Sequence, residues 1–404
     1  MDKVVVVAAV RTPFGKYRGA LKEYSATDLA RHALVAAMER SAVPKASVEG
    51  LYLGVAVGAG LGPNVARTVA VSAGMPIESH AVTVNEVCGS SLKALRMAQL
   101  SIMAGDAQML AVGGVESMTR APMIIPDDID QDAEDAEQSS AEDTEQGSAG
   151  EPEQPVKAIF KDGLIDSFSA LPMGITAEHI ADAYSVSRHM QDAFAYDSHR
   201  KALRAVSQHH FDDEIVPLAG LSHDETIRPD TSLLKLASLK PVYREHGSVT
   251  AGNAAPLSDG AAMLIIATER KAKSLGLKPL GYLGSYAEVG YDPAYMGYAP
   301  SIAIENLLKR SGTKVSDYDL YEITEAFAAQ VIAVRDSLHI PDDRLNINGG
   351  SLALGHPLGA SGARLVMALL NNLASRKLHS GIAALCIGGG QGIAMEIFQE
   401  DQTA

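Results

Sequence analysis

Two stretches of the chain repeat the same order of elements, and this repetition limits the folds that the chain can adopt. In the first, an apolar run (Ala81–Val87) stops at Cys88, a helical pattern follows, and a second apolar run leads to Gly113. In the second, a helical pattern and an apolar run span the 26 residues from Gly362 to Gly388, against 25 from Cys88 to Gly113. Strand, turn, helix and strand in this order form a βαβ-type unit. We therefore expect an internal duplication, with two such halves packed together.

The negative charge of the chain is concentrated in one segment. The 404 residues carry a formal charge of −15, but the segment from Asp127 to Pro155 holds 12 Asp or Glu and no Lys or Arg, which leaves −3 for the rest. This segment also lacks aromatic residues, so it cannot bury enough apolar area to offset the entropy of ordering. We expect a mobile surface insertion there, with an electrostatic gate or docking tail as the alternative. The nearly neutral remainder gives no sign of nucleic-acid binding.

Composition and cysteine usage indicate a globular protein of a reducing compartment. The chain is 47% hydrophobic and 21% charged, and its length suits two to three domains. No apolar run approaches the roughly 18 residues of a membrane span, and the apolar core at the N-terminus is too short for a usual signal peptide. Only Cys88 and Cys386 occur, far apart and without a CxxC companion, so neither a disulfide framework nor a zinc site is expected. We expect a cytoplasmic location.

Other segments have clear local patterns. The apolar run Val4–Val10 predicts a buried parallel strand, and Ser25–Arg40 predicts a helix with Ser25 or Thr27 as its N-cap. Leu51–Val57 predicts another strand. The residues from Thr250 predict a helix that ends near Ala262, before a strand at Met263–Ala267.

Cys88 lies where a helical pattern begins. A thiol at a helix N-terminus is close to unpaired backbone N–H groups and to the positive end of the helix dipole. That setting lowers a thiol pKa from about 8.5 and makes the sulfur a nucleophile. The alternative is a buried structural cysteine, since a free cysteine often behaves as a small hydrophobic residue.

Three further features are candidates for the same pocket as Cys88. His356 lies in a Gly-His-Pro turn, Glu325–Phe327 follows an apolar strand, and Cys386 precedes Gly388. Each feature alone is weak, because a histidine beside Gly and Pro is more often a loop residue and a lone cysteine is more often part of a core.

Taken together, the motifs resemble those of the thiolase family, the acetyl-CoA C-acyltransferases. The likeness covers the whole chain except the acidic segment, through the strings RTPFGK, VNEVCGSSLKAL, AVGGVESM, MGITAEH, VTAGNA with SDGAA, ITEAFAAQ, NGGSLALGHPLGASGAR and CIGGGQGIA. It implies the α/β thiolase fold, in which two similar mixed-sheet halves form a layered α-β-α-β-α core beside a loop domain. The implied domains are residues 1–119 with 251–268, the loop domain 120–250 with the acidic insertion 127–155, and residues 269–404.

The resemblance also implies roles for individual residues. Cys88 would be the acylated nucleophile, His356 the base that activates it, and Cys386 the acid that protonates the departing carbanion. Backbone N–H groups of Cys88 and Gly388 would form one oxyanion hole, and His356 with a water would form the other. In the usual pattern an Asn holds that water, whereas this chain has Thr324, so we expect an altered enolate site.

The implied contacts with coenzyme A include a second departure from the family. Ala255 stands where many members have a serine that contacts pantetheine, which removes a hydrogen bond worth about 0.5–1.5 kcal/mol. The other implied contacts are a cation near the nucleotide, Arg228, and an apolar channel formed by Leu164, Met173, Leu239, Tyr243, Ala251, Leu257, Ala326 and Phe327.

The resemblance leaves the substrate open. The PMGIT and DETIRPDTSLLKLASLKP strings are more similar to degradative 3-ketoacyl-CoA thiolases, because acetoacetyl-CoA synthases often have His where Pro172 stands. The alternatives are an acetyl-CoA acetyltransferase and an acyl-CoA-binding protein with little turnover. Coenzyme A would be a substrate, with no resident cofactor and no metal. We expect a homodimer, with a homotetramer as the alternative.

Overall fold

The computed structural model describes residues 3–125 and 155–399. The strands are β1 (Val4–Arg11), β2 (Gly15–Lys16), β3 (Gly50–Gly54), β4 (His80–Val84), β5 (Met109–Ser117), β6 (Met123–Ile124), β7 (Val156–Lys157), β8 (Ser258–Thr268), β9 (Gly281–Gly290), β10 (Leu320–Ile323), β11 (Ser380–Ile387) and β12 (Gln391–Phe398). The α-helices are α1 (Ala26–Arg40), α2 (Val65–Ser72), α3 (Ser90–Ala104), α5 (Ala158–Gly163), α6 (Gly174–Ala183), α7 (Arg188–Ser207), α8 (Leu233–Ala237), α9 (Glu269–Ser274), α10 (Ala299–Ser311), α11 (Ala328–Leu338), α12 (Ser351–Leu354) and α13 (Ser361–Arg376). The 3₁₀ turns are η1 (Lys45–Ser47), η2 (Val87–Gly89), η3 (Pro293–Tyr298), η4 (Val315–Asp317) and η5 (Leu358–Ala360).

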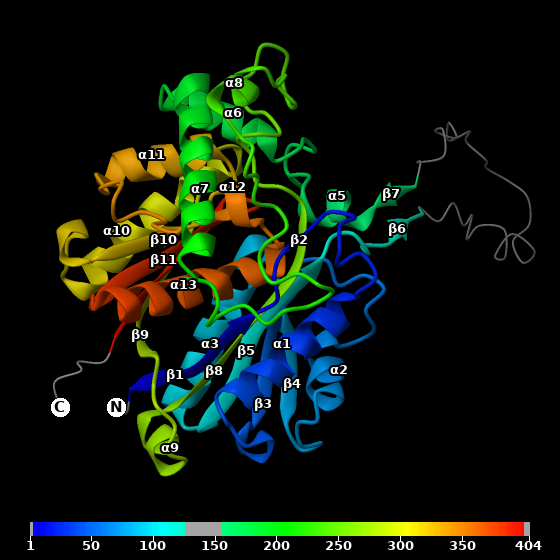
Figure 1. The fold of residues 1–404 in the computed structure, drawn as a ribbon, viewed down its shortest axis with the longest axis vertical. Coiled ribbons are helices and arrows are strands. Elements are labelled where there is room, and N and C mark those ends of the chain that lie inside the picture. The colour runs from blue at the N-terminus through cyan, green and yellow to red at the C-terminus, as the bar shows by residue number, and fades with distance from the viewer. Residues whose placement is uncertain (1–2, 126–154, 400–404) are drawn as a thin grey trace, which may run out of the picture.

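The main sheet is mixed and runs through both halves of the chain. Its strands follow the order β10-β11-β12-β9-β1-β8-β5-β3-β4, and β2 adds to β8. Parallel pairs join β3 to β4 and β5, and β10 to β11, whereas the central pairs are antiparallel. The two halves meet where β1 pairs with β9 through only two residue pairs, Val5 with Tyr282 and Val6 with Gly281. This short junction lets the sheet bend into two layers (Figure 1).

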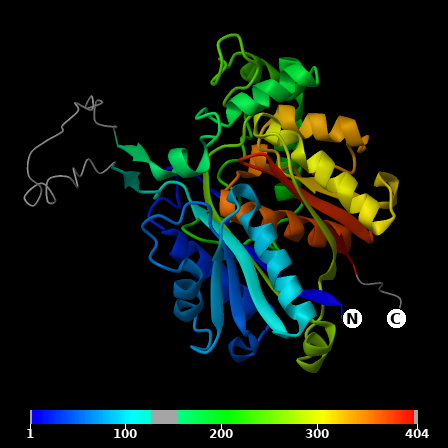
Figure 2. The same ribbon diagram turned by 180° about the vertical axis from the view of Figure 1, so that it is seen from behind.

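The helices form three layers around the two parts of the sheet. Helices α3 and α13 lie between them, because Leu92 of α3 and Leu365 of α13 share one core with strands of both halves. Helices α1 and α2 cover the outer face of β3, β5 and β8, and α10 and α11 cover the outer face of β10 to β12 (Figures 1 and 2). The α-β-α-β-α order expected from the resemblance is therefore confirmed.

Helices α3 and α13 also confirm the internal duplication. Each follows a 3₁₀ turn and begins at a serine, Ser90 or Ser361, and each leads to a strand that ends near the candidate site. Because these serines correspond, the counterpart of Cys88 in the second half is Gly359, and the pairing of Cys88 with Gly362 in the sequence comparison was three residues out of register.

Three expectations about strands were wrong. The run Val4–Val10 is a buried strand, but β1 pairs antiparallel with β8 and β9 and not parallel. Its run is apolar because both of its faces are buried, and that pattern does not depend on the direction of the neighbouring strands. Residues 250–262 contain no helix, because β8 already begins at Ser258 and is buried along its whole length. Its small residues allow close packing: a Cβ at Gly260 would lie 2.3 Å from the Phe14 ring. The strand expected at Leu51–Val57 ends at Gly54, because the next backbone N–H groups turn to a side chain, the carboxylate of Glu116. The helix at Ser25–Arg40 is confirmed, and Ser25 accepts from the Asp28 N–H as its N-cap.

The part of the loop domain after Pro155 is anchored to the first strand by a buried ion pair. Arg11, at the end of β1, places Nε 2.7 Å from Glu214 and Nη1 2.6 Å from Asp224, and all three side chains are buried. A buried guanidinium without carboxylate partners would be strongly destabilising, so this contact fixes how residues 158–250 lie across the core.

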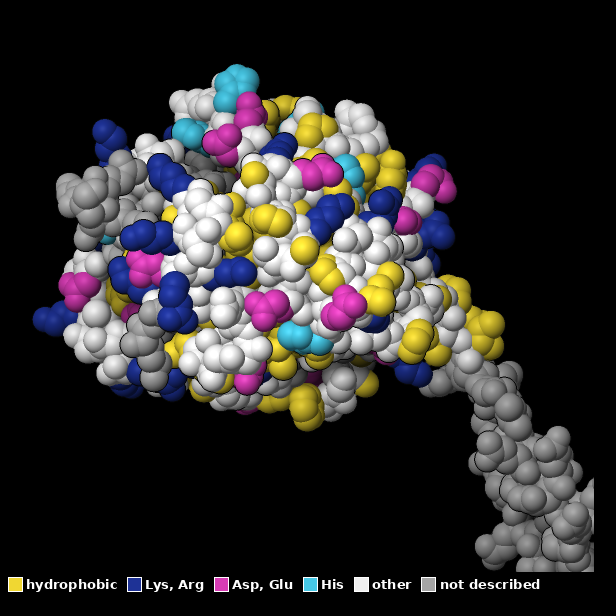
Figure 3. Space-filling view, turned by 90° about the horizontal axis from the view of Figure 1, so that it is seen from below, with side chains coloured by type: hydrophobic (Ala, Val, Ile, Leu, Met, Phe, Trp, Pro, Cys, Tyr) yellow, Lys and Arg dark blue, Asp and Glu magenta, His cyan; other side chains and the backbone are white. Residues whose placement is uncertain are grey.

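The described surface carries both signs of charge. Figure 3 shows Lys and Arg side chains mixed with Asp and Glu on the face seen from below, as expected from a charge of only −3 outside the acidic segment. The expectation for that segment falls on residues 127–154, which lie outside the described residues. Within the described ranges, no helix has the length and apolar character needed to cross a membrane.

Candidate active site

Cys88, His356 and Cys386 line one cavity of about 390 Å³. They arrive there from three separate segments: the 3₁₀ turn η2, the turn between α12 and η5, and the end of β11. The rest of the lining is almost wholly apolar, which excludes water and strengthens the electrostatic interactions inside.

The Cys88 thiol is buried in the 3₁₀ turn just ahead of α3. Burial raises its pKa to about 12, although backbone N–H groups of Gly388 and of Cys88 itself favour the thiolate. The expectation of a lowered pKa was therefore wrong, because the loss of solvent outweighs the helix N-terminus. The resting thiol is neutral, and a base must take its proton as the sulfur reacts.

His356 is held by two serines. Its backbone N–H donates to Ser258 Oγ at 3.2 Å, and its ring Nδ1 lies 2.6 Å from Ser361 Oγ. Nε2 is buried and has no hydrogen-bond partner among the described residues. Burial, together with the nearby Arg364 guanidinium, lowers the pKa of His356 to about 3, so the imidazole is neutral and can accept a proton.

Cys386 lies near the end of β11, opposite Gly392 of β12. Burial raises its pKa, and Cys88, which lines the same cavity, raises it further. Both cysteines are free thiols. Gly388 lies two residues further along, and a Cβ there would lie 2.2 Å from Met173 Cε, so a larger residue would have to displace the end of the Met173 side chain.

Glu116 ties the turn after His356 to the first half of the molecule. Its buried carboxylate accepts from the backbone N–H groups of Ala56 and Val57, after β3, and of Gly359, in η5. Burial raises its pKa to about 7 in spite of these donors. The carboxylate therefore sets the distance between the two halves beside the cavity.

Thr324 directly follows β10, and its backbone N–H donates to the carbonyl oxygen of Ala384 in β11. Its Oγ1 is buried and finds no partner among the described residues. The following Glu325 is structural, because it accepts from Ser198, from Asn346 and from the Leu352 N–H.

The expected substrate contacts fall into two groups. Seven of them line the cavity: Leu164, Met173, Tyr243, Ala255, Leu257, Ala326 and Phe327. Arg228 and Ala251 are exposed and do not line it, and Leu239 packs against Gly252 instead.

Sequence reasoning did not identify the remaining lining residues, which are Met118, Phe160, Ile165, Pro172, Gly174, Val242, Pro256, Met296 and Leu358. Three of them, Met118, Gly174 and Leu358, belong to motif strings that the resemblance rests on, and Pro172 opens the PMGIT string, so the strings could have pointed to these four. The others are apolar residues of separate segments, including Phe160 of α5 and Met296 of η3, and no local pattern distinguishes them from core residues.

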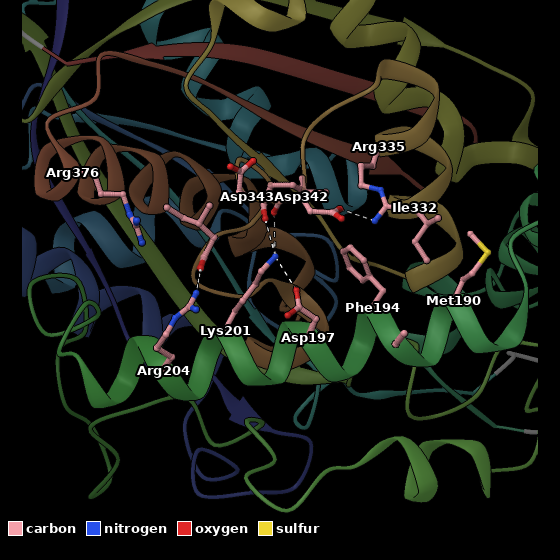
Figure 4. A pocket seen from close by; sticks show the side chains of 13 residues that line it. Met190, Phe194, Asp197, Lys201, Arg204, Ile332, Arg335, Asp342, Asp343 and Arg376 are labelled. Atoms are coloured by element: carbon pink, nitrogen blue, oxygen red, sulfur yellow. Dashed lines mark hydrogen bonds and ion pairs between the residues drawn. The ribbon is translucent and has the colours of Figure 1, made fainter.

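A second, larger hollow of about 720 Å³ lies along α7 (Figure 4). Its charged groups pair with one another: Lys201 lies 3.0 Å from Asp197, and Arg335 lies 2.8 Å from Asp342. Its described lining includes no cysteine or histidine. In the described part of the chain, no three His, Cys, Asp or Glu side chains are grouped so as to hold a metal ion. The chemistry therefore belongs to the smaller, apolar cavity.

A neutral thiol, an imidazole with a free nitrogen and a second thiol in a dry cavity define a site for covalent cysteine catalysis. Residues 4–270 match the family described as "Thiolase, N-terminal domain", and residues 277–399 match "Thiolase, C-terminal domain". The chain therefore belongs to the thiolase family, and it is an acyltransferase.

Relatives and solved structures agree with this assignment. A "Probable acetyl-CoA acyltransferase" of Staphylococcus epidermidis is 42% identical over 98% of both chains, and a "Probable acetyl-CoA acetyltransferase" of Escherichia coli K12 is 41% identical over 99% of this chain and 100% of the relative. Human mitochondrial 3-ketoacyl-CoA thiolase in complex with CoA superimposes with a TM-score of 0.91 at 36% identity, covering 99% of this chain and 98% of the other. The acetyl-CoA acetyltransferase of Bacillus anthracis gives 0.91 at 37% identity, with coverage of 98% and 99%.

Proposed function

We propose that the protein is a degradative thiolase, which cleaves a 3-oxoacyl-CoA with a second coenzyme A to give acyl-CoA and acetyl-CoA. The observation that carries the proposal is the convergence of Cys88, His356 and Cys386 in one apolar cavity. The solved 3-ketoacyl-CoA thiolase with bound CoA supports it, because that fold and this one superimpose closely.

In the first half-reaction, Cys88 attacks the 3-oxo carbon as its proton passes to His356 Nε2. The bond between C2 and C3 then breaks, the acyl group stays on sulfur as a thioester, and the electron pair leaves with C2 as the acetyl-CoA enolate. Cys386 donates its proton to C2. A neutral thiol suits this step, because it can release a proton to a carbanion and occupies little space.

In the second half-reaction, the incoming CoA gives its thiol proton to the Cys386 thiolate and attacks the acyl-thioester. Cys88 leaves and recovers its proton from His356, so every group returns to its resting state. Such a scheme predicts ping-pong kinetics with an acyl-enzyme intermediate. Coenzyme A is a substrate in this scheme, and no resident cofactor is needed.

Two oxyanion sites support the charges that develop. Backbone N–H groups of Cys88 and Gly388 favour the Cys88 thiolate, so they are suited to an oxygen bound at the attacked carbon. For the enolate, we propose His356 and a water on Thr324 Oγ1. A hydroxyl offers one donor where the usual amide offers two, so this second site is the weaker one.

The binding of coenzyme A follows the same cavity outward. The pantetheine arm would run between Tyr243, Leu257 and Phe327, which line the cavity. Arg228 is exposed and would meet the nucleotide phosphates outside it. Leu239 and Ala251 would border the entrance.

Acylation of Cys88 is the direct test. Incubation with an acyl-CoA, followed by mass spectrometry of the peptide that contains Cys88, should reveal a covalent acyl adduct. If the adduct is absent, the protein is instead a thiolase-like protein that binds acyl-CoA with little turnover. The two departures from the family pattern, Thr324 and Ala255, would then account for the lost activity.

Steady-state rates separate the two enzymatic candidates. An acetyl-CoA acetyltransferase is the second candidate, because relatives of similar identity carry that name. We expect a higher kcat/KM with a medium-chain 3-oxoacyl-CoA than with acetoacetyl-CoA. A strong preference for the four-carbon substrate would reverse the order of the candidates.

We also propose a homodimer that acts in the cytoplasm. Among the strands of the described residues, β4 pairs only with β3, so its other edge is open to a second copy, and Met97, Leu100 and Met103 of α3 are exposed. Both thiols are free, as suits a reducing compartment. Light scattering that gives the mass of four chains would replace the dimer with a tetramer.

A further inference from the structure

Ser361 is in direct contact with the ring of His356. It is the first residue of α13, five positions after His356, and both side chains are buried. The distance from His356 Nδ1 to Ser361 Oγ is 2.6 Å, and the distance from Ser361 Oγ to the Pro357 carbonyl oxygen is 3.0 Å. These three groups form a short chain: ring nitrogen, hydroxyl, carbonyl.

The chemistry of this chain decides where the hydrogens lie. A carbonyl oxygen can only accept, so the contact with Pro357 exists only if the Ser361 hydroxyl donates to it. The Ser361 oxygen then has lone pairs toward the ring, and His356 Nδ1 must carry the hydrogen. The reverse arrangement, with the hydroxyl donating to Nδ1, would break the contact with Pro357 and bury an Nε2–H without an acceptor.

We propose that Ser361 is a positioning residue that fixes the tautomer of His356, with hydrogen on Nδ1 and a free lone pair on Nε2. Nε2 is the ring nitrogen without a described partner, and it is the atom that receives the Cys88 proton in the proposed function, on which this inference rests. Without the hydroxyl, Nε2 can carry the hydrogen itself, and His356 then cannot accept the proton of Cys88.

The contact of His356 with Ser258 does not influence which tautomer the ring adopts. Ser258 binds the backbone N–H of His356, at 3.2 Å, and its own hydroxyl donates to the Pro256 carbonyl at 2.8 Å. That contact holds the main chain of the turn, and it is indifferent to which ring nitrogen is protonated. Among the described hydrogen bonds of His356, only the one to Ser361 distinguishes the two tautomers.

Nitrogen NMR of protein labelled with ¹⁵N-histidine reads the tautomer directly, because protonated and bare ring nitrogens have well-separated shifts. The His356→Gln variant identifies the His356 signals. In the unaltered protein we expect Nδ1 to be protonated and Nε2 bare, and in Ser361→Ala we expect a second population with the reverse pattern. A bare Nδ1 in the unaltered protein, or an unchanged pattern in Ser361→Ala, overturns the proposal.

The matched control is Ser90→Ala, which removes the hydroxyl from the corresponding first residue of α3. It should leave the His356 signals unchanged, and a shift to the reverse tautomer there would also overturn the proposal. Ser361→Thr keeps the hydroxyl, so it should restore the original tautomer; if it folds and does not, the hydroxyl is not the cause.

Kinetics provide the second measurement. Loss of the hydrogen-bond partner that orients a metal-ligating histidine typically lowers activity about 10- to 100-fold, and we take the same range for the orientation of His356. We expect a loss of that size in kcat for Ser361→Ala, with KM and the melting temperature nearly unchanged. If Cys88 is acylated at the same rate in Ser361→Ala as in the unaltered protein, the inference about Ser361 is wrong and the proposed function is unaffected. If the unaltered protein shows no acylation, the proposed function is wrong, and the NMR measurement still decides whether Ser361 fixes the tautomer.

Discussion

The turns η2 and η5 have the same local construction and carry different chemistry. Each leads into a helix whose first residue is a serine, and each serine hydroxyl donates back to a carbonyl: Ser90 to Val87 at 2.6 Å, and Ser361 to Pro357 at 3.0 Å. The serines differ in what they accept. Ser90 accepts a backbone N–H, whereas Ser361 meets the His356 ring. The same local structure thus supports the proposed nucleophile, Cys88, in one half and its proposed base, His356, in the other.

The two turns face each other because their helices begin side by side. The Ala363 N–H donates to Ser91 Oγ at 2.9 Å, and a Cβ at Gly362 would lie 2.6 Å from the Leu92 nitrogen. Only glycine allows the helices to approach so closely. The duplication therefore brings the sulfur and the imidazole into one cavity without a long loop, and altering either half should break the pair in a different way.

The largest effect is expected in the first turn, from Cys88→Ser. A hydroxyl in place of a thiol is a far weaker nucleophile, and loss of a nucleophile can cost about 10⁶-fold in kcat. We expect turnover to fall by at least about 10⁴-fold, with little change in melting temperature because the two side chains are similar in size. Thiolysis measured by the absorbance of the 3-oxoacyl-CoA gives the rate. Retention of more than a tenth of the activity would remove Cys88 from its role.

Cys386→Ser tests the second half with a different readout. Loss of a general acid costs about 10² to 10⁴-fold, so cleavage of the carbon–carbon bond should fall in that range. Transfer of an acyl group from acyl-CoA to Cys88 needs no carbanion, so the acyl adduct should still form. Equal loss of both reactions would contradict the proposal that Cys88 is the nucleophile and Cys386 the acid.

Glu116→Gln disrupts the hydrogen bonds that join Ala56 and Val57 of the first half to Gly359 of the second. Both oxygens of the Glu116 carboxyl accept N–H groups, and both keep lone pairs whether or not the group is protonated, whereas the nitrogen of an amide can only donate. We therefore expect a loss of about 1–3 kcal/mol in the free energy of unfolding. The raised pKa of Glu116 determines whether its contribution to stability grows or shrinks with pH. The folded pKa, about 7, lies above the ordinary value of 4.5, so this group stabilises the protein below about pH 4.5, and that contribution is lost as pH rises to 7.

Urea titrations at several pH values measure this difference. Glu86 and Glu322 also have raised pKa values of about 7, so only the comparison between the unaltered protein and Glu116→Gln isolates the one carboxyl. The stability advantage of the unaltered protein should be largest near pH 4.5 and should shrink toward pH 7, by at most about 1.4 kcal/mol per pH unit. A constant difference would show that Glu116 does not titrate in this window.

Much of the molecule could be predicted from the sequence, where a long motif or a strong period existed. The βαβ order around Cys88, the layered fold and the meeting of Cys88, His356 and Cys386 in one cavity were predicted correctly, because each rests on residues close in sequence or on an extended string. The second half of β8 was predicted as the strand Met263–Ala267, but its first half from Ser258 was not, since small residues such as those around Gly260 suit a helix equally well until the neighbouring ring of Phe14 is known.

The properties of the site that depend on burial could not be predicted. The pKa of Cys88 rises rather than falls because chain segments far away in sequence, including Phe160 and Met296, close the cavity and remove water. Those residues carry no pattern of their own. The sequence identified the groups that we propose to react, and the assembled fold determines their resting protonation state.

The smallest expected effect comes from Thr324→Asn, which tests a third segment of the site, the residue that follows β10. Thr324 Oγ1 is buried without a described partner, and an amide there reaches further and offers two donors. If an enolate oxygen forms beside His356, the variant should raise kcat a few-fold, by an amount equivalent to part of one hydrogen bond of about 1 kcal/mol. Thr324→Val, which has nearly the same shape without the hydroxyl, is the matched control and should lower kcat by a similar factor. Equal rates for all three proteins would mean that the Thr324 hydroxyl takes no part in stabilising the enolate.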